Sequence, residues 1–359
     1  MKQKLLNLFT WRATLLVALL CTSFGNAWGQ TTSTLTFTAS NNVLQTNDGI
    51  SWSTSQNKTE WSNDDPNVLT SSSITGMVKE VVVTAHTGNK NCHYKITVNV
   101  GDNDFGTKTD LGSNSSTSTS FNVSNAVYVN NKQIEISIQR TSQNKKITLE
   151  SVEVTYVSKA TIPAPGALDK DANPAKYYGT YSNKCQFVVP SGLTVSKVSV
   201  SSGTLAVTDL SGTIPANTGV MISAGNNQNS YTVDLKLATV SAISNNMLKP
   251  TGDNGITEEA MRATGSAFYY LTINPENDQI GFYRRNEDGD AFAMPANKAY
   301  LAISSTGVKG YSLNDVVNGI KAVEATETEN KAIYNLAGQR VSKMQKGIYV
   351  VNGKKMIRR

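Results

Sequence analysis

Two histidines and a cysteine lie close together in the sequence and have the chemistry to ligate a metal. His86, Cys92 and His93 flank the turn Thr87-Gly-Asn-Lys-Asn91, so their side chains could meet at the end of a hairpin. The chain holds only two histidines, so no third imidazole exists to complete a zinc site. Residues at hairpin ends are usually just solvated, and that is the simpler interpretation.

Acidic residues in three turn-like segments offer oxygen ligands for Ca²⁺. In Asp102-Asn-Asp-Phe-Gly106 the carboxylates of Asp102 and Asp104 alternate along the chain, as calcium ligands often do. A β-turn favours the same residue types. Asp64-Asp65 and Glu287-Asp288-Gly289-Asp290 admit the same two interpretations. Because no full ligand set is visible, we expect no cofactor, with Ca²⁺ at Asp102 and Asp104 as the alternative.

Two tryptophans in a polar, turn-rich segment suggest sugar binding. Trp52 and Trp61 lie between Asp48 and Pro66, among Asn, Asp and Ser residues. Flat aromatic rings at the rim of a β-sandwich can stack on sugar rings, while nearby Asn and Asp side chains bind hydroxyls. The alternative is that either ring packs in the core.

Sequence motifs of common enzymes are missing. The chain has no Gly-x-Ser-x-Gly elbow, no His-Glu-x-x-His helix and no phosphate-binding loop. A carboxylate pair for glycoside hydrolysis could come from distant strands, but nothing in the sequence indicates one. We therefore assign no catalytic residue and expect a protein that is not an enzyme.

The basic residues are concentrated at the two ends of the chain. The whole chain has a net charge of +6, but residues 1–29 hold three basic residues and residues 331–359 hold eight, with no acid in either. The remaining chain has 22 basic and 27 acidic residues, a net charge of −5. A protein that wraps phosphates needs positive charge on its folded body, so we reject nucleic-acid binding.

Residues 1–29 have the pattern of a secretory signal peptide. Three basic residues precede a mostly apolar stretch from Ala13 to Phe24, and Ala27-Trp28-Gly29 provides small residues for cleavage before Gln30. As a helix, that stretch would span only about 18 Å, too short for a membrane anchor. A lipid anchor at Cys21 is disfavoured because Leu20 is not a small residue. We expect secretion and no integral membrane span.

Residues 332–359 are expected to form a small β-meander that ends in a hairpin. Asn335 to Gly338 supplies a turn, a strand starts at Gly347, and Asn352-Gly353 is a strong signal for a two-residue hairpin turn. The alternative is an ordinary final hairpin that caps the preceding domain. Residues 319–331 include the acidic, polar stretch Glu324–Asn330 and are expected to be a linker.

This tail resembles the C-terminal sorting domain of the type IX (Por) secretion system of Bacteroidota. The matching features are Ile333-Tyr334-Asn335-Leu336, Gly338-Gln-Arg-Val341, Gly347-Ile-Tyr-Val350 and the terminal basic cluster. The match covers about 30 residues, fewer than the family module usually has. The resemblance implies delivery to the outside of the outer membrane and contact with the secretion machinery through Gly347, Tyr349, Lys354, Lys355, Arg358 and Arg359.

Residues 30–158 are expected to form an all-β domain, a β-sandwich of the jelly-roll type. Ile134, Ile136 and Ile138 alternate with polar residues, and several short β-branched runs are separated by polar turns. The apolar parity changes between Leu149 and Val152, which requires a β-bulge or a break near Glu150-Ser151. The polar stretch Gly112–Ser120 is expected to be an exposed loop.

The first domain resembles the carbohydrate-binding-module-like sandwiches of secreted Bacteroidota proteins. Val78-Lys-Glu-Val-Val-Val83 and the closing Ser151-Val-Glu-Val-Thr-Tyr156 carry the resemblance. Sandwiches of this kind host many functions, so the resemblance names no ligand.

Residues 159–318 are expected to form a second strand-rich domain of the sandwich type, preceded by a Pro-rich boundary near 158–166. One short helix is expected from Thr257, a good N-cap that is followed by two glutamates. The segment Pro-Ala-Asn occurs at Pro215 and again at Pro295, each time before an apolar strand. We interpret it as a reused strand entry rather than a ligand site. With Tyr177-Tyr-Gly-Thr180 and Gly281-Phe-Tyr283, it resembles an uncharacterised Bacteroidota surface domain.

These observations favour a secreted, surface-displayed, non-catalytic protein that binds a glycan or a host or matrix protein. The alternatives are a hydrolase with an atypical site, acting on glycans or nucleic acids, and a purely structural surface component. Cys92 and Cys185 remain after signal removal, one in each expected domain, and we expect both to be reduced and buried.

Overall fold

A computed structural model describes residues 31–313 apart from Asn63, Lys90, 143–144, Ser202, Gln228, Gly265, Glu276, 285–291 and 305–307, and also short strands between 333 and 358. The expected signal peptide, the linker, the Asp288-Gly289 turn and Arg359 lie outside the described residues. The chain divides into two compact units, Met1–Val316 and Val317–Arg359. The described residues are almost entirely β, which confirms the all-β sandwich fold class.

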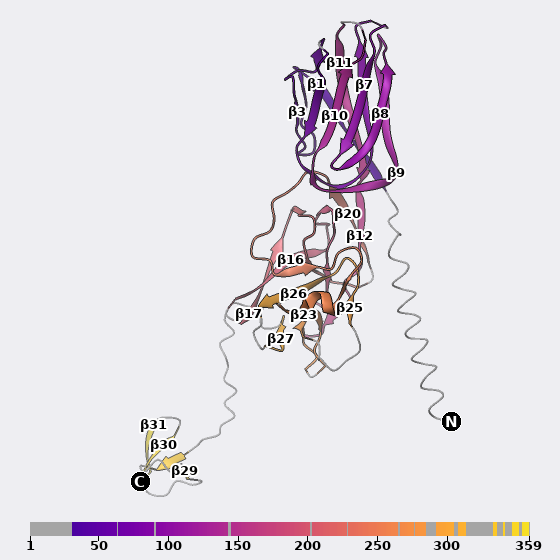
Figure 1. The fold of residues 1–359 in the computed structure, drawn as a ribbon. Helices are drawn as coiled ribbons and strands as arrows, with labels where there is room; N and C mark the ends of the chain where they lie inside the picture. The colour runs from indigo at the N-terminus through magenta and orange to yellow at the C-terminus, as the bar shows by residue number, and fades with distance from the viewer. Residues whose placement is uncertain are drawn as a thin grey trace, which may run out of the picture. The chain divides into compact units, whose positions relative to one another are not determined.

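The first β-sandwich consists of two antiparallel sheets (Figure 1). One has the order β2-β1-β11-β6-β9, with β4 pairing β11, and the other the order β3-β5-β10-β7-β8. Its strands are β1 (Thr32–Ser40), β2 (Val43–Leu44), β3 (Trp52–Thr54), β4 (Glu60–Trp61), β5 (Asn67–Ser71), β6 (Ile74–Thr87), β7 (Tyr94–Val100), β8 (Asn103–Leu111), β9 (Thr117–Lys132), β10 (Ile134–Arg140) and β11 (Ile147–Val157).

Strict alternation places the core between these two sheets. In β7 and β10 every second residue is buried, because successive side chains of a strand point to opposite faces. The register of β11 on β6 shifts between Leu149 and Ser151, so the expected bulge is confirmed at Glu150. The expected loop Gly112–Ser120 is shorter than predicted, because Thr117–Ser120 already pair with β6 as the start of β9.

The second β-rich part begins with a four-stranded sheet, β12-β20-β15-β18, and a five-stranded sheet, β13-β14-β19-β16-β17. Buried residues such as Phe187, Val195 and Leu235 belong to one apolar core that both sheets share. The strands are β12 (Lys159–Ile162), β13 (Ala167–Asp169), β14 (Lys176–Tyr181), β15 (Gln186–Val188), β16 (Thr194–Ser201), β17 (Thr204–Leu210), β18 (Thr213–Ile214), β19 (Val220–Ala224) and β20 (Tyr231–Lys236).

A second five-stranded sheet, β21-β26-β23-β24-β27, follows, with a separate pair β22-β25. The short helix α2 is confirmed after Thr257, whose hydroxyl accepts the amide of Ala260 as an N-cap. These elements are β21 (Leu248–Pro250), β22 (Ile256–Thr257), α2 (Glu258–Arg262), β23 (Ser266–Ile273), β24 (Ile280–Tyr283), β25 (Ala293–Met294), β26 (Ala299–Ser304) and β27 (Gly310–Ser312).

The two five-stranded sheets are built from one repeated unit. We call β14–β19 the first repeat and β21–β26 the second repeat. In each, the last strand lies between the first strand and a hairpin: β19 between β14 and β16, and β26 between β21 and β23. In each, two short strands pair with one another, β15 with β18 and β22 with β25.

The Pro-Ala-Asn turns occupy the same place in both repeats. Asn217 and Asn297 end the turns with φ of 54° and 57°, the left-handed region that asparagine tolerates. The amide of Asn217 donates to the carbonyl of Asn183, and that of Asn297 donates to the carbonyl of Gly252. The expected reuse of a strand entry is therefore part of a larger repetition, which includes every strand of the unit.

The first sandwich exchanges core residues with the first repeat and with the strands β12 and β20 that pair beside it. Leu237, which follows β20, is buried in the core of the first sandwich, and its carbonyl accepts the amide of Thr75 at 2.9 Å. In return Met77 and Tyr128 pack against the core of the first repeat, and the Tyr128 hydroxyl donates to the carbonyl of Lys184. Neither core is complete without residues of the other.

The second unit contains a small antiparallel sheet with the order β29-β28-β30-β31. Its strands are β28 (Ile333–Asn335), β29 (Arg340–Val341), β30 (Gly347–Val351) and β31 (Lys354–Arg358). The expected tail residues Gly347 and Tyr349 lie in β30, and Lys354, Lys355 and Arg358 lie in β31. The tail is thus a four-stranded sheet rather than the expected meander, because β30 pairs with β28 and not with β29. Its sorting role remains a prediction.

Candidate functional site

Several connections of the first sandwich meet at one end, which we call the loop end. β6 ends at Thr87, beside the start of β11 at Ile147, while β10 ends at Arg140, beside the start of β7 at Tyr94. The β6–β7, β8–β9 and β10–β11 connections therefore lie together, and the segment before β5 joins them through Arg140. Loops held by a rigid sheet are where binding residues of β-sandwiches usually lie.

Hydrogen bonds between the loops fix their backbones. The amide of Thr87 donates to the carbonyl of Ser113 at 2.7 Å, and Gly88 donates to Lys146 at 2.9 Å. The amide of Thr141 donates to the carbonyl of His93 at 2.8 Å. Each of these bonds joins two different connections, so the loop end is a preformed surface.

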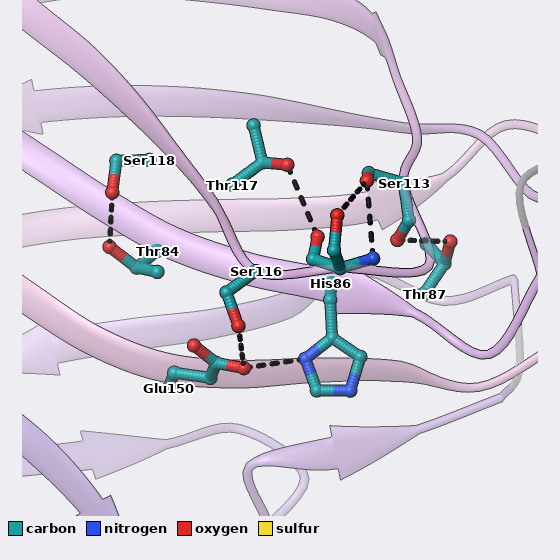
Figure 2. A network of polar contacts seen from close by, with 9 residues as sticks. Thr84, His86, Thr87, Ser113, Ser116, Thr117, Ser118 and Glu150 are labelled. Atoms are coloured by element: carbon teal, nitrogen blue, oxygen red, sulfur yellow. Dashed lines mark hydrogen bonds and ion pairs between the residues drawn. The ribbon is translucent and has the colours of Figure 1, made fainter.

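A polar network on Glu150 is the most organised group at this end (Figure 2). The hydroxyl of Ser116 donates to Oε1 of Glu150 at 2.6 Å, and Nδ1 of His86 lies 2.7 Å from the same oxygen. The three residues come from the β8–β9 loop, β6 and the bulge of β11. On the same face of β6 and β9, the hydroxyls of Thr84 and Ser118 form a separate contact of 2.9 Å.

The electrostatics of this network fix its proton positions. The hydroxyl of Ser116, and then His86, lower the pKa of Glu150 below the ordinary value for a glutamate. The carboxylate is therefore ionised at neutral pH and can only accept, so Nδ1 of His86 must carry a proton. Nε2 of His86 and the second oxygen of Glu150 have no hydrogen-bond partner among the described residues. The side chains of His86 and Glu150 are 32% and 33% exposed, so both can meet a ligand.

Ser116, Glu150 and His86 do not form a nucleophilic triad. A triad requires the histidine to accept the proton of the serine hydroxyl. Here both Ser116 and His86 bond to the same carboxylate oxygen, and a glutamate with a lowered pKa is a weak base. The arrangement suits the orientation of hydrogen-bonding groups rather than activation of a nucleophile.

Two further contacts with carboxylates lie at the loop end, one made by His93 and one by Arg140. Nδ1 of His93 lies 2.8 Å from the carboxylate of Asp110. The guanidinium of Arg140, whose side chain is 4% exposed, contacts the carboxylate of Asp64 at 2.5 Å and also donates to the carbonyl of Ser62. Arg140 thus anchors the segment before β5 to the sandwich.

The proposed metal ligands do not come together. His86 belongs to the sheet of β6, His93 precedes β7 of the other sheet, and each pairs with its own carboxylate. Cys92 is buried and its thiol lies 3.8 Å from the carbonyl of Lys145. Across the part of the chain that the structure describes, no group of three or more His, Cys, Asp or Glu residues could hold a metal.

Asp102 and Asp104, the calcium alternative, each have another partner in this structure, and calcium binding there stays a prediction. Asp102 forms an ion pair with Lys132 at 3.0 Å, and Asp104 accepts the amide of Gly106 at 2.7 Å. The second contact closes a local turn of the type that aspartate favours. Gly101, with φ of 58°, completes the tight connection between β7 and β8.

The stacking platform at Trp52 and Trp61 is wrong, because both rings are in the core. Trp52 is 8% exposed and packs edge-on against Phe37 with ring centroids 5.5 Å apart. Trp61 is 2% exposed and lies on β4, beside Ile147. The polar neighbours of both residues in the sequence form turns, while the rings fill the space between the sheets.

Cys92 and Cys185 are both buried and neither is in a disulfide, as expected. Burial raises the pKa of the Cys185 thiol to about 12, so this sulfur stays protonated and unreactive at neutral pH. Both thiols therefore have a packing role in the structure.

Sequence reasoning missed Ser116, Glu150 and Arg140. A signal for Glu150 existed, since the parity change of the apolar residues falls at this position. That change predicts the bulge, but it does not predict that the side chain of Glu150 contacts Ser116 and His86. Nothing local in the sequence points to Ser116, which lies 34 positions from its partner.

Comparisons with known proteins give no family. No family model matches the chain, and no curated protein matches it. A family two carbohydrate esterase from Cellvibrio japonicus is 17% identical, with a TM-score of 0.22 over 35% of this chain and 34% of that one. Dimeric latent PorU from Porphyromonas gingivalis is 8% identical, with a TM-score of 0.23 over 60% of this chain and 22% of that one.

The Endo-D glycoside hydrolase domain from Streptococcus pneumoniae is 9% identical, with a TM-score of 0.19 over 57% of this chain and 37% of that one. The chain thus spans little more than a third of each of these structures, or less. At these TM-scores none of them establishes a shared fold or activity.

Within the described residues, no helix is long and apolar enough to cross a bilayer.

Proposed function

We propose that this protein is a secreted, surface-displayed, non-catalytic binding protein whose loop end contacts a glycan. The observation that carries the proposal is the pair His86 and Glu150, held by Ser116 on interlocked loops with one face open to solvent. A preformed polar site loses little conformational entropy when it binds a ligand.

The chemistry of the pair fits a polyhydroxylated ligand. The second oxygen of Glu150 can accept from a sugar hydroxyl, and Nε2 of His86 can accept from another while the ring is neutral. The hydroxyls of Thr84 and Ser118 lie on the same face of β6 and β9 as His86 and Ser116 and can act as further donors or acceptors (Figure 2). Binding would rest on hydrogen bonds, since both candidate tryptophans are in the core.

A binding role fits the described residues better than hydrolysis does. Glycoside hydrolysis needs two carboxyl groups that face the scissile bond from opposite sides. Around the loop end Asp64 pairs with Arg140, Asp110 with His93 and Glu60 with Lys146, and no second carboxylate contacts Glu150 in the described residues. A hydrolase with an atypical site is the alternative, and it predicts chemical change of the bound glycan.

Surface display rests on the sequence features of the two ends. We propose that the first 29 residues direct export and that the tail contacts the secretion machinery. A chain ending at Asn330 should then accumulate in the periplasm while its body melts at the same temperature as that of the full chain. Loss of cooperative melting on truncation would instead make the tail part of the folded body.

A glycan array with the full-length chain tests the binding proposal. We expect wild type to bind one or a few related glycans and Glu150→Gln to lose at least tenfold in affinity, about 1.4 kcal/mol. Glu135→Gln is the matched control, because Glu135 is exposed on β10 in the other sheet. Mass spectrometry of the bound glycan after prolonged incubation should show no change.

Absence of any glycan signal, or equal loss in both variants, would contradict the glycan proposal. Cleavage or deacylation of the bound glycan would favour the hydrolase.

A further inference from the structure

The two repeats differ in the layer that covers the outer face of their sheets. In the first repeat the short pair β15-β18 is widened by β20 and β12 into a four-stranded layer. Lys236 pairs with Gln186, and Leu235 pairs with Phe187, so β20 runs antiparallel to β15. The covered residues Phe187 and Ile222 are 0% and 1% exposed.

In the second repeat the same layer holds only its two short strands and the helix α2. Ile256 pairs with Met294 in β22-β25 as Phe187 pairs with Ile214 in β15-β18. Ile256 and Phe187 therefore hold equivalent positions. Among the described residues β22 pairs with no strand besides β25, whereas its counterpart β15 pairs with β20 as well.

The apolar surface under this smaller layer is only partly covered. Met261 of α2 is fully buried and, with Phe268, Met294 and Tyr300, forms a small core. Ile256, Tyr270, Phe292 and Ala302 pack against that core but remain partly exposed. In the second repeat Ala302 of β26 pairs with Phe268 of β23, and in the first repeat Ile222 of β19 pairs with Val195 of β16. Ala302 is therefore the counterpart of Ile222.

We propose that the edge of β22 and this half-covered surface, Ile256, Tyr270, Phe292 and Ala302, accept an extended strand from a partner polypeptide. The chain itself shows the chemistry of the occupant, because β20 takes this position in the first repeat. In β20, Val233 and Leu235 are buried while Thr232 and Asp234 are exposed. The partner strand runs antiparallel to β22 and carries apolar residues at every second position, which cover Ile256 and Ala302 as Leu235 packs with Phe187 and Ile222 in the first repeat.

Strand addition satisfies two demands at once. Among the described residues β22 pairs only with β25, so its other edge can take a further strand, and the partner's apolar residues remove exposed apolar side chains from water. The site is independent of the loop end, so failure of glycan binding would leave this proposal standing, and the reverse also holds.

The experiment uses a synthetic peptide that copies residues 229–238 as the probe, with a photoreactive phenylalanine at the position of Leu235 and a fluorophore at one end. Titrated into the full chain and followed by fluorescence anisotropy, it should bind saturably. Irradiation should attach it to residues of β22, α2 or the segment around Phe292, as read by mass spectrometry. A peptide with Asp at the positions of Val233 and Leu235 should not bind.

Two variants of the chain test the surface itself. Ile256→Asp and Ala302→Asp should each weaken peptide binding at least tenfold, while Val43→Asp, at a 49% exposed valine on β2 of the first sandwich, should leave it unchanged. Thermal unfolding of each variant verifies its fold, and the cross-linking map of the wild-type chain decides the matter if a variant does not fold. No saturable binding, or cross-links confined to β15 and β12 through displacement of β20, would overturn the proposal.

Discussion

At the residue scale, the proposed binding site depends on how Glu150 is placed and ionised. The bulge between Leu149 and Ser151 changes which side chains of β11 point to each face of the sheet. The side chain of Glu150 at this bulge contacts Ser116 and His86. Because its folded pKa lies below the ordinary value, the network stabilises the fold above the ordinary carboxyl pKa. This contribution is lost as the pH falls through the folded pKa, and solvent screening keeps it small.

Removing the largest cause of that shift should move the titration in a defined direction. We expect Ser116→Ala to raise the pKa of Glu150 towards the ordinary value, because the hydroxyl that stabilises the carboxylate is gone. Carboxyl-carbon NMR titration of the full chain measures this directly, with Glu153 of the same strand as an internal reference. An unchanged or lower pKa in the variant would show that Ser116 does not hold the carboxylate.

The tryptophans have a structural role that truncation should reveal. Trp61→Ala should cost about 3–5 kcal/mol of unfolding free energy, since it empties a large volume between the sheets. Val43→Ala, at an exposed position, should change stability by less than about 0.5 kcal/mol. Urea unfolding of both variants provides the comparison. A stability loss below about 1 kcal/mol for Trp61→Ala would indicate that this ring is exposed rather than packed in the core.

At the element scale, local signals in the sequence predicted local structure well. The N-cap Thr257 starts a helix, and the change in apolar parity near Glu150 marks a bulge. The Pro-Ala-Asn segments form turns that lead into strands. Each of these features depends on backbone preferences within a few residues, so the sequence carries the information in one place. The strand ends of the tail hairpin were predictable for the same reason.

Contacts between distant segments were not predictable in this way. Trp52 and Trp61 stand among polar residues, and only the packing of two sheets shows that their rings point inwards. His86 contacts Glu150 although 64 positions separate them in the sequence, and alternation and turn signals carry no information about pairs so far apart. The repeated unit was visible only as a three-residue segment, because its two copies share topology rather than sequence.

The paired turns give a matched test of the repeat. Asn217→Ala and Asn297→Ala should each destabilise the protein by roughly 1–2 kcal/mol, because alanine is strained at the positive φ that both turns require. Asn217→Gly and Asn297→Gly should restore most of that loss, since glycine adopts this conformation freely. Denaturant unfolding of the four variants measures both effects. Equal losses for glycine and alanine would point to the side chains rather than to the backbone.

At the scale of the whole molecule, the exchange of core residues joins the first sandwich to the first repeat. Leu237 fills a space beside Gly76, where an added Cβ would lie 2.5 Å from Cδ2 of the leucine. Leu237→Ala should therefore cost about 2–5 kcal/mol, although it lies outside the first sandwich in sequence. We expect one cooperative transition in calorimetry for residues 31–313, shifted as a whole by this change. Two separate transitions, with only one shifted, would show that the two parts unfold independently.

The most direct test of the central claim is a hydrogen-exchange footprint of the full chain, recorded with and without the oligosaccharide that gives the strongest array signal. If the loop end binds glycan, protection should be confined to the β6–β7, β8–β9 and β10–β11 connections and the bulge at Glu150, and Glu150→Gln should abolish it. Protection elsewhere in the chain, or none at a saturating concentration of the oligosaccharide, would contradict the assignment of the loop end as the binding site.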